Sequence, residues 1–318
     1  MSDATPVLLS VGLSCLDLVW RVERFPPAAS RTEATAHARH GGGPAATAAV
    51  AAARFGVEAR LWALHGDDAA GRELHAALER EGVDVSGVHA PAGAETFVSA
   101  VLVEPSGERW IFPYRGRGLD DDPADWPLDA VAGVDAVLTD LRHPALARAV
   151  LRRARAAGVP SVVDLGNLRD VDATDDADVI IAAKEAAEAA LGGPLAGEGD
   201  ATWRAEAALE AVRRRPDQVV AITLGDEGVV FDAGEGVRHL SAFPVEATDT
   251  TGAGDVFHGV WAAALAAGEP PVRCATLASV AAAESCRGPG RTAIPTGDAV
   301  RTLLESRTLA ELNATRWA

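Results

Sequence analysis

The sequence has few aromatic residues, few cysteines and a single lysine, Lys184. Only 5% of its 318 residues are aromatic whereas 48% are hydrophobic, so we expect an aliphatic core. The cysteines, which are Cys15, Cys274 and Cys286, have no C-x-x-C spacing, and this argues against a disulfide framework or a zinc site. No apolar run is as long as a membrane span, and the N-terminus lacks the features of a signal peptide. We therefore expect a cytoplasmic globular protein.

The charge of the chain is strongly one-sided. Acidic residues outnumber basic residues by 46 to 29, which gives a formal net charge of −17 at pH 7. A surface of this sign repels nucleic-acid backbones and anionic lipids, so we expect neither nucleic acid nor a membrane as a partner. An anionic small molecule would have to be held by locally placed arginines or by backbone N–H groups.

The order of apolar and amphipathic segments predicts an α/β fold. We expect a buried strand at 7–12, a helix at 44–55 and a strand at 83–90, with strands and helices alternating through much of the remaining chain. Strands that alternate with helices form a mostly parallel sheet covered on both faces. No linker divides the chain, so residues 1–318 are predicted to form a single domain.

Two segments interrupt this alternation. Residues 17–40 and 96–113 have mixed polarity along their length, which is typical of antiparallel ribbons with two exposed faces. The second ribbon turns at Ser106-Gly107. We expect these ribbons to form a small β-sheet beside the main one.

The segment DTTGAGDVFHG, residues 249–259, carries the clearest chemical signal. It lies between a strand-like segment and a helix that begins near Asp255, where backbone N–H groups favour an anion. The small residues there, Gly252, Ala253 and Gly254, allow a phosphate to approach the backbone closely. Asp255 is then placed to accept a proton from a hydroxyl that attacks the phosphate. The alternative is that Asp255 only caps the helix and the glycines only make a turn.

This segment resembles the signature D-T-x-G-A-G-D of the PfkB (ribokinase-like) carbohydrate kinases, matched by Asp249, Thr250 and residues 252–255. Other segments resemble the family in the same order along nearly the whole chain. They are Asp17 after the first strand, GGGPAATAAVAAARFG at 41–56, GDDAAG at 66–71, TLGDEG at 223–228 and SVAAAESCRGPGRTAIP at 279–295.

The resemblance implies a ribokinase-like three-layer sandwich in which the two ribbons form a lid over the sugar. It also implies transfer of the γ-phosphate of ATP to a hydroxymethyl group, with Asp255 as the general base. The N–H groups of residues 252–255 would stabilise the transferred phosphoryl group, and Mg²⁺ would bridge the ATP phosphates. Asp249 and the carbonyls of Thr251 and the 287–290 loop would hold a monovalent cation such as K⁺.

Further binding residues follow from the same resemblance. For the sugar, the matching residues are Asp17, Gly42, Gly43 and Thr47. For the nucleotide, the matching residues are Thr223, Gly225 and Gly228, with His258 expected nearby on the helix that follows the signature.

Three departures from the family pattern bear on these roles. Where the family has N-x-x-E, which organises Mg²⁺ and the phosphates, this chain has Lys184 and Ala187. Glu185 or Glu188 would have to replace the missing carboxylate, or Lys184 would supply charge to the nucleotide directly. Thr47 stands where the family has a sugar-binding Asn. The segment DLGNLRD resembles the family's D-P-N-x-R with altered spacing, which makes Asn167 and Arg169 candidate phosphate or substrate contacts.

The acceptor sugar is less clearly indicated. The segments at 41–54 and 249–259 resemble the sulfofructose kinase branch of the family, whose substrate carries a sulfonate. Arg142 is then the first candidate to bind the sulfonate and Arg31 the second. Pro113 stands where a polar contact is expected in that branch, which leaves neutral acceptors open. These are substrates of the fructokinase, ribokinase or ketodeoxygluconate kinase type.

Two other functional classes are alternatives to the kinase, and a second copy of the chain is an expected partner. A catalytically weak sensor of sugar phosphates would explain the altered N-x-x-E motif but has no need of Asp255. A dinucleotide-dependent dehydrogenase would need G-x-G-x-x-G after the first strand, where this chain has VGLSCLD. Family members often pair through their lids, so we expect a homodimer whose surface includes Trp20 or Trp110.

Overall fold

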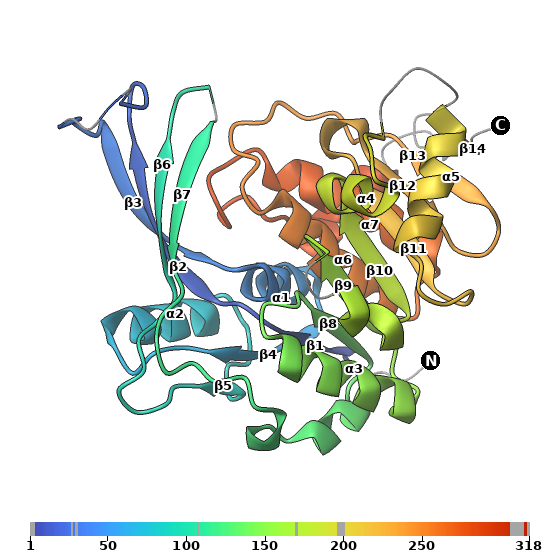
Figure 1. Cartoon of the computed structure of the whole chain (residues 1–318), viewed down its shortest axis with the longest axis horizontal. Helices are drawn as coiled ribbons and strands as arrows, with labels where there is room; N and C mark the ends of the chain where they lie inside the picture. Colours follow the sequence, from blue (N-terminus) through green and yellow to red (C-terminus); the bar gives the residue numbers. More distant parts are fainter. Residues whose placement is uncertain are drawn as a thin grey trace.

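The computed structural model describes residues 4–26, 28, 31–106, 108–168, 171–195, 201–305 and 315–316. The chain forms three layers, with a large sheet between two sets of helices, and a smaller sheet extends away from this body (Figure 1). The predicted three-layer α/β sandwich with a small second sheet is therefore confirmed. In the described part of the chain, no helix has both the length and the hydrophobicity needed to cross a membrane.

The large sheet is mostly parallel. Its strands are β1 (Val7–Val11), β4 (Glu58–Leu64), β5 (Val88–His89), β8 (Ala136–Thr139), β9 (Ser161–Leu165), β10 (Val179–Ala183), β11 (Val219–Thr223), β12 (Val229–Asp232), β13 (Val237–Leu240) and β14 (Thr315–Arg316). Their order is β14-β13-β12-β11-β10-β9-β8-β1-β4-β5. Pairing is parallel from β5 to β11 and antiparallel from β11 to β14. The carboxyl ends of the parallel strands therefore share one edge, where ligands bind in folds of this kind.

The prediction of a strand at 83–90 is wrong over most of that range. Only Val88–His89 pairs as a strand, and Asp84 makes an isolated bridge to Arg60. Between them the amide of Ser86 donates to Asp84 Oδ1 at 2.9 Å. This local bond to a side chain turns the backbone and competes with strand pairing.

The smaller sheet is built from the two predicted ribbons. Its strands are β2 (Cys15–Arg21), β3 (Ala36–Gly42), β6 (Val98–Val103) and β7 (Arg109–Tyr114), in the order β3-β2-β6-β7. The ribbons join through a parallel pairing of β2 with β6, in which Leu16 lies opposite Val98. We call this four-stranded sheet the lid sheet. It extends from the body beside α1 and α2 (Figure 1).

Helices cover both faces of the large sheet because its strands are apolar on both sides. The α-helices are α1 (Pro44–Phe55), α2 (Ala69–Arg80), α3 (Pro144–Ala157), α4 (Lys184–Leu191), α5 (Ala201–Val212), α6 (Ala253–Ala266), α7 (Pro271–Ser285) and α8 (Gly297–Glu305), and short 3-10 helices lie at Pro123–Asp125, Leu128–Gly133, Val171–Asp176 and Gly225–Glu227. Successive residues of β1 point to opposite faces, so Leu8 packs in the core with α1 and α6, whereas Leu9 packs in the core with α3. The α4 and α5 helices complete the second face.

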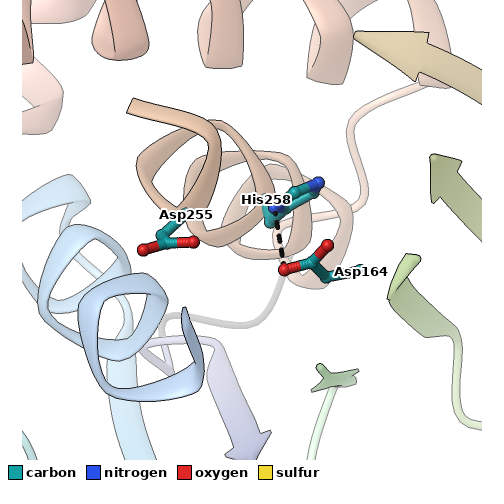
Figure 2. A group of neighbouring side chains, drawn as sticks. All are labelled: Asp164, Asp255 and His258. Carbon is teal, nitrogen blue, oxygen red and sulfur yellow. Dashed lines mark ion pairs between the residues drawn. The ribbon is translucent and has the colours of Figure 1, made fainter. Parts of the chain in front are cut away.

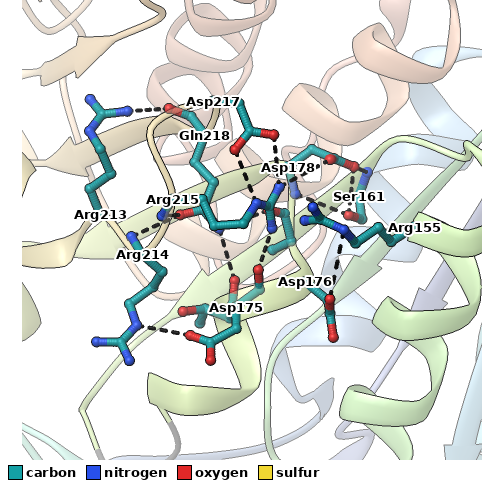
Figure 3. A network of polar contacts seen from close by, with 12 residues as sticks. Arg155, Ser161, Asp175, Asp176, Asp178, Arg213, Arg214, Arg215, Asp217 and Gln218 are labelled. Carbon is teal, nitrogen blue, oxygen red and sulfur yellow. Dashed lines mark hydrogen bonds and ion pairs between the residues drawn. The ribbon is translucent and has the colours of Figure 1, made fainter.

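A polar network joins the amino-terminal ends of β9, β10 and β11 (Figure 3). Gln218, which is buried just before β11, donates to the carbonyls of Thr174 and Ala177 at 2.9 and 2.8 Å. Its side-chain oxygen accepts from the amides of Arg214 and Arg215 at 2.9 and 2.8 Å. Each polar atom of the buried amide group is therefore satisfied. This network lies at the edge of the sheet opposite to the carboxyl ends, so we treat its charges as structural.

Close packing of α1 against α6 aligns the amino-terminal ends of both helices. At Gly259 an added Cβ atom would overlap the carbonyl oxygen of Ala48, so the two backbones are in direct contact. Alanines of α1 such as Ala45 and Ala49 are fully buried in this region. Small residues on both helices therefore determine how closely the helices approach.

We predict that Gly259→Ala lowers the free energy of unfolding by about 1–3 kcal/mol. The added methyl group forces α1 and α6 apart, and this overpacking outweighs the gain in helix propensity of about 1 kcal/mol. Denaturant unfolding measures the change. Gly133→Ala is the matched control, because an added Cβ atom there meets nothing within 4 Å. Equal stability of the two variants would contradict close helix packing.

Candidate active site

A cleft of about 870 Å³ separates the lid sheet from the body. Residues 109, 111 and 113 of β7 line it, as expected for one face of a strand with alternating side chains. The amino-terminal ends of α1 and α6 form part of the opposite wall. The predicted site residues that line the cleft are Asp17, Gly42, Gly43, Thr47, Arg142, Asp249, Thr251, Gly252 and Asp255. Arg31 is exposed and does not line it.

The first turn of α6 presents free backbone donors to this cleft. Gly252 precedes the helix with φ 78°, and no side chain caps the helix among the described residues. The first helical amides, those of Gly254 and Asp255, have no acceptor within the helix because they lie in its first turn. The amide of Ala253 is different, since it donates to the carbonyl of Thr250 at 3.3 Å. The expected anion site therefore keeps Gly254 and Asp255 as donors, and Ala253 is already bonded.

Asp255 is held in a poorly solvated position. Burial and, to a smaller extent, the neighbouring Asp164 carboxylate together raise the pKa of its carboxyl to about 7. A carboxyl group with this pKa is a stronger proton acceptor than an ordinary aspartate when it is ionised. It is therefore suited to take a proton from a hydroxyl group near neutral pH.

Asp164 and His258 lie beside Asp255 (Figure 2). Asp164, near the end of β9, lies with its Oδ2 3.5 Å from Nδ1 of His258, and burial raises its pKa to about 7. Burial lowers the pKa of His258 to about 4, so its ring is neutral at pH 7. Ligand atoms of Asp164, Asp255 and His258 all lie within 4.8 Å of one another, which is close enough for the three to hold a cation.

The expected position of His258 near the nucleotide needs correction. Its side chain is only 6% exposed, and it does not line the cleft. The α6 helix places it against Asp164 of β9, in the interior of the protein. No local pattern indicates Asp164 as the partner of His258, because that contact joins residues on different elements.

Asp140 is a further acidic residue that sequence reasoning missed. It is 6% exposed at the end of β8, and its carboxylate accepts from the amides of Leu13, Ala45 and Arg142 at 2.8, 3.0 and 2.9 Å. The carboxylate thereby joins three loops of the cleft. The only available signal was its place after an apolar strand in TDLRH.

On the sugar side, Asp17 of β2 lies beside Gly42 of β3. An added Cβ atom at Gly42 would overlap the Asp17 carboxylate, so this position must stay without a side chain for Asp17 to face the cleft. Burial raises the pKa of Asp17 above its usual range. Arg142 lines both this cleft and a smaller adjoining cavity with Asn167. Arg169 lies outside the described residues.

Two arginines of the cleft were also missed. Arg291 donates through Nε and Nη2 to Thr47 Oγ1 at 3.2 and 3.1 Å. Arg109 of the lid sheet donates to Thr251 Oγ1 at 2.7 Å, which connects the lid sheet to the signature loop. The abundance of arginine in the sequence hides such residues, since nothing local distinguishes them from surface arginines.

The expected nucleotide residues lie together at the carboxyl ends of β10 and β11. Ala183 pairs with Thr223, and Lys184 Nζ lies 3.0 Å from Glu227 Oε1 in the turn between Gly225 and Gly228. This contact brings the single lysine to the glycine turn, although the two are far apart in the sequence.

The segment at 184–188 does not fit the carboxylate site for Mg²⁺ that the resemblance implies. Ala187 is buried, Glu185 is exposed, and Glu188 Oε1 accepts from the amide of Leu195 at 2.9 Å. A resident divalent ion would therefore have no converging carboxylates here.

The loop expected to hold a monovalent cation is well fixed. The amide of Thr251 donates to Asp249 Oδ1 at 2.9 Å. The amides of Thr248 and Asp249 donate to the carbonyl of Cys286 at 2.8 and 3.2 Å. The 248–251 loop and the start of the 287–290 loop are therefore adjacent. This arrangement fits a cation that is bound by oxygen atoms from both loops.

The chain was compared with known families and structures. A family model described as pfkB family carbohydrate kinase matches residues 6–297. The ATP-dependent ribose-1-phosphate kinase of Halopiger xanaduensis is 30% identical over 305 residues, which cover 94% of this chain and 98% of that protein. The ribokinase of Bacillus subtilis is 28% identical over 300 residues, which cover 92% of this chain and 98% of that protein. The structure of Arabidopsis thaliana ribokinase complexed with ribose and ATP shares the fold, with a TM-score of 0.83 at 23% identity over 96% of this chain and 100% of that chain.

We predict that the Asp255 carboxyl titrates near pH 7 and that Asp164→Asn moves this titration to lower pH. Removal of the neighbouring negative charge favours the ionised form of Asp255, while burial keeps its pKa above the usual aspartate range. The ¹³C carboxyl resonances of labelled aspartate, followed from pH 4 to pH 9, measure the shift. Asp249→Asn is the control, because Asp249 is not among the groups that shift Asp255. A titration of Asp255 near pH 4 in the unaltered protein would contradict the expected burial.

Proposed function

Because the chain belongs to the pfkB family of carbohydrate kinases, we propose that Asp255 is the general base that activates a sugar hydroxymethyl group toward the γ-phosphate of ATP. The observation that carries this proposal is the placement of Asp255 in the cleft at an uncapped helix amino terminus. The ionised carboxylate takes the hydroxyl proton as the oxygen attacks phosphorus. The amides of Gly254 and Asp255 donate to the transferred phosphoryl group, whose equatorial oxygens carry the charge.

The nucleotide is proposed to bind as Mg·ATP along the carboxyl ends of β10 and β11. Thr223, Gly225 and Gly228 would contact it, with Lys184 near its phosphates. The ion pair of Lys184 with Glu227 supports this role, because it holds the ammonium group beside the glycine turn. The positive charge of Lys184 would then perform part of the role that the N-x-x-E carboxylate and Mg²⁺ have in other members of the family. A monovalent cation held by Asp249, the Thr251 carbonyl and the carbonyls of the 287–290 loop would support the phosphate-binding loop.

For the acceptor, we propose a sugar that carries an anionic group. The named substrate of the Halopiger relative is ribose 1-phosphate, which is anionic. Arg142 lines the cleft and makes no ion pair with the described residues, so its guanidinium is free to meet an anion. Sulfofructose is one such acceptor. A neutral sugar of the ribokinase, fructokinase or ketodeoxygluconate kinase type, or a weakly catalytic sensor of sugar phosphates, is the alternative.

We also propose that two copies pair through the lid sheet. Trp110, Phe112 and Tyr114 lie on the face of the edge strand β7 opposite to the cleft, and they are between 43% and 56% exposed. Trp20 contacts the ring of His37 within the same sheet, and Trp110 stacks on the ring of Phe25. Free, buried cysteines support the proposed reducing, cytoplasmic setting.

We expect Asp255→Asn to lower kcat by about 10²–10⁴-fold with little change in ATP binding. The amide cannot accept the hydroxyl proton but leaves the phosphate donors in place. ADP release with ribose, fructose, ribose 1-phosphate and sulfofructose measures turnover, and calorimetry measures ATP binding. Asp249→Asn removes the other carboxylate of the same motif and should retain far more turnover. Substantial activity of Asp255→Asn would refute the assignment of the base, and no turnover by the unaltered protein on any acceptor would favour the sensor.

We expect the unaltered protein to be a dimer and Phe112→Asp to weaken the dimer markedly. A charge in the middle of an apolar interface must be desolvated without a partner. Light scattering after gel filtration, over a range of concentrations, measures the mass. Ala124→Asp places the same charge at an exposed position outside the lid sheet and should leave the dimer intact. A monomeric unaltered protein would exclude this pairing.

A further inference from the structure

Arg291 is fixed in the wall of the acceptor side of the cleft. It follows α7 in the chain and reaches Thr47 in the first turns of α1 and Gly42 at the end of β3. Besides its bonds to Thr47, it donates through Nη2 to the Gly42 carbonyl at 3.0 Å. These bonds use Nε and Nη2, so one side of the guanidinium is held and its orientation is set.

The opposite side of this guanidinium has no bonded partner among the described residues. Its Nη1 atom lies over Gly41, where an added Cβ atom would be only 2.8 Å away. No carboxylate of the described residues is within the ion-pair distance of 4.0 Å. Arg291 is only partly solvated, and a charge taken out of water without an ionic partner costs several kcal/mol. The position is therefore suited to a group of opposite charge that enters with a ligand.

The nearby acidic residues do not serve as that group. Asp17 and Asp255 influence Arg291 only at longer range, and burial keeps the pKa of each above its usual value. An ion pair with Arg291 would lower these pKa values and would occupy carboxylates that face the cleft. Arg109 is not equivalent to Arg291, because Arg109 is exposed on the lid sheet and only its Nη1 is bonded, to Thr251.

We propose that Arg291, positioned by Thr47 and Gly42, forms an oxyanion subsite in the acceptor pocket. The subsite selects sugars that bear a phosphate, sulfonate or carboxylate group in addition to the hydroxyl group that is phosphorylated. This inference rests on the proposed sugar kinase function, and it names Arg291 as the residue that selects an anionic acceptor. Thr47 suits the arrangement because its short hydroxyl side chain accepts from the guanidinium, and both Thr47 and Arg291 line the cleft.

Matched pairs of acceptors test this subsite. The pairs are ribose with ribose 1-phosphate, and fructose with sulfofructose. In Arg291→Gln we expect kcat/KM for the anionic member of the preferred pair to fall on the order of 10- to 100-fold, mainly through KM, because charge-assisted hydrogen bonds are lost. The value for the neutral member should change less than about threefold. Arg291→Lys, which keeps the charge but not the planar fork, should fall between the two. The pair with the larger effect distinguishes a phosphate from a sulfonate.

Arg54→Gln is the matched control for the position of the loop. Arg54 donates to the carbonyls of Arg291 and Ile294 at 3.0 and 2.9 Å, so it holds the same loop without placing charge in the cleft. An equal loss for both members of a pair, or the same selective loss in Arg54→Gln, would overturn the subsite. So would an unchanged preference in Arg291→Gln.

A failure of the kinase function gives a different result. In that case the unaltered protein releases no ADP with any acceptor, and binding becomes the readout. Calorimetry with ribose 1-phosphate should then still show at least tenfold weaker binding to Arg291→Gln than to the unaltered protein or to Arg54→Gln. Equal binding to all three proteins would overturn the subsite independently of catalysis.

Discussion

The structure of the cleft depends on the burial of Asp255 at the amino terminus of α6. Direct packing of α6 against α1 at Gly259 sets the α6 amino terminus beside Thr47, where Asp255 is partly buried. The same packing leaves Gly254 and Asp255 as uncapped donors. The proton acceptor and the anion-binding helix end therefore lie together, because the backbones of α1 and α6 are in contact at Gly259, in the next turn of α6.

A second constraint is the placement of positive charge in an acidic protein. The net charge of −17 disfavours anions over most of the surface, yet Arg142 and Arg291 both line the cleft. Arg142 is exposed and Arg291 is partly buried, and salt in the solvent screens such charges within about 10 Å, so both act over a short range inside the cleft. A local field of this kind can select an anionic acceptor despite the overall charge.

Sequence reasoning succeeded where function depends on residues that are close along the chain. The signature loop, the two ribbons and the glycine turn at 225–228 were all placed correctly relative to strands and helices. It failed where a local interaction competed with the pattern, as at Asp84 and Ser86, and where a helix face had to be chosen, as at His258. It also missed Asp140, Asp164 and Arg291, because the contacts that bring them to the site, with Leu13, His258 and Thr47 respectively, each join residues more than 90 positions apart.

The sequence by itself determined the layered α/β fold, the family and the position of Asp255. These three conclusions depend on the spacing of hydrophobic residues, on the spacing of glycines and on one contiguous motif. Each of these features can be recognised without knowing which distant residues are in contact. Only the tertiary structure decided which charges meet. The contact of Arg291 with Thr47 and the contact of Asp164 with His258 each join separate elements, and burial then changes what those groups can do. Proton affinity and unpaired charge are properties of the folded environment, because water would screen the same side chains in the unfolded chain.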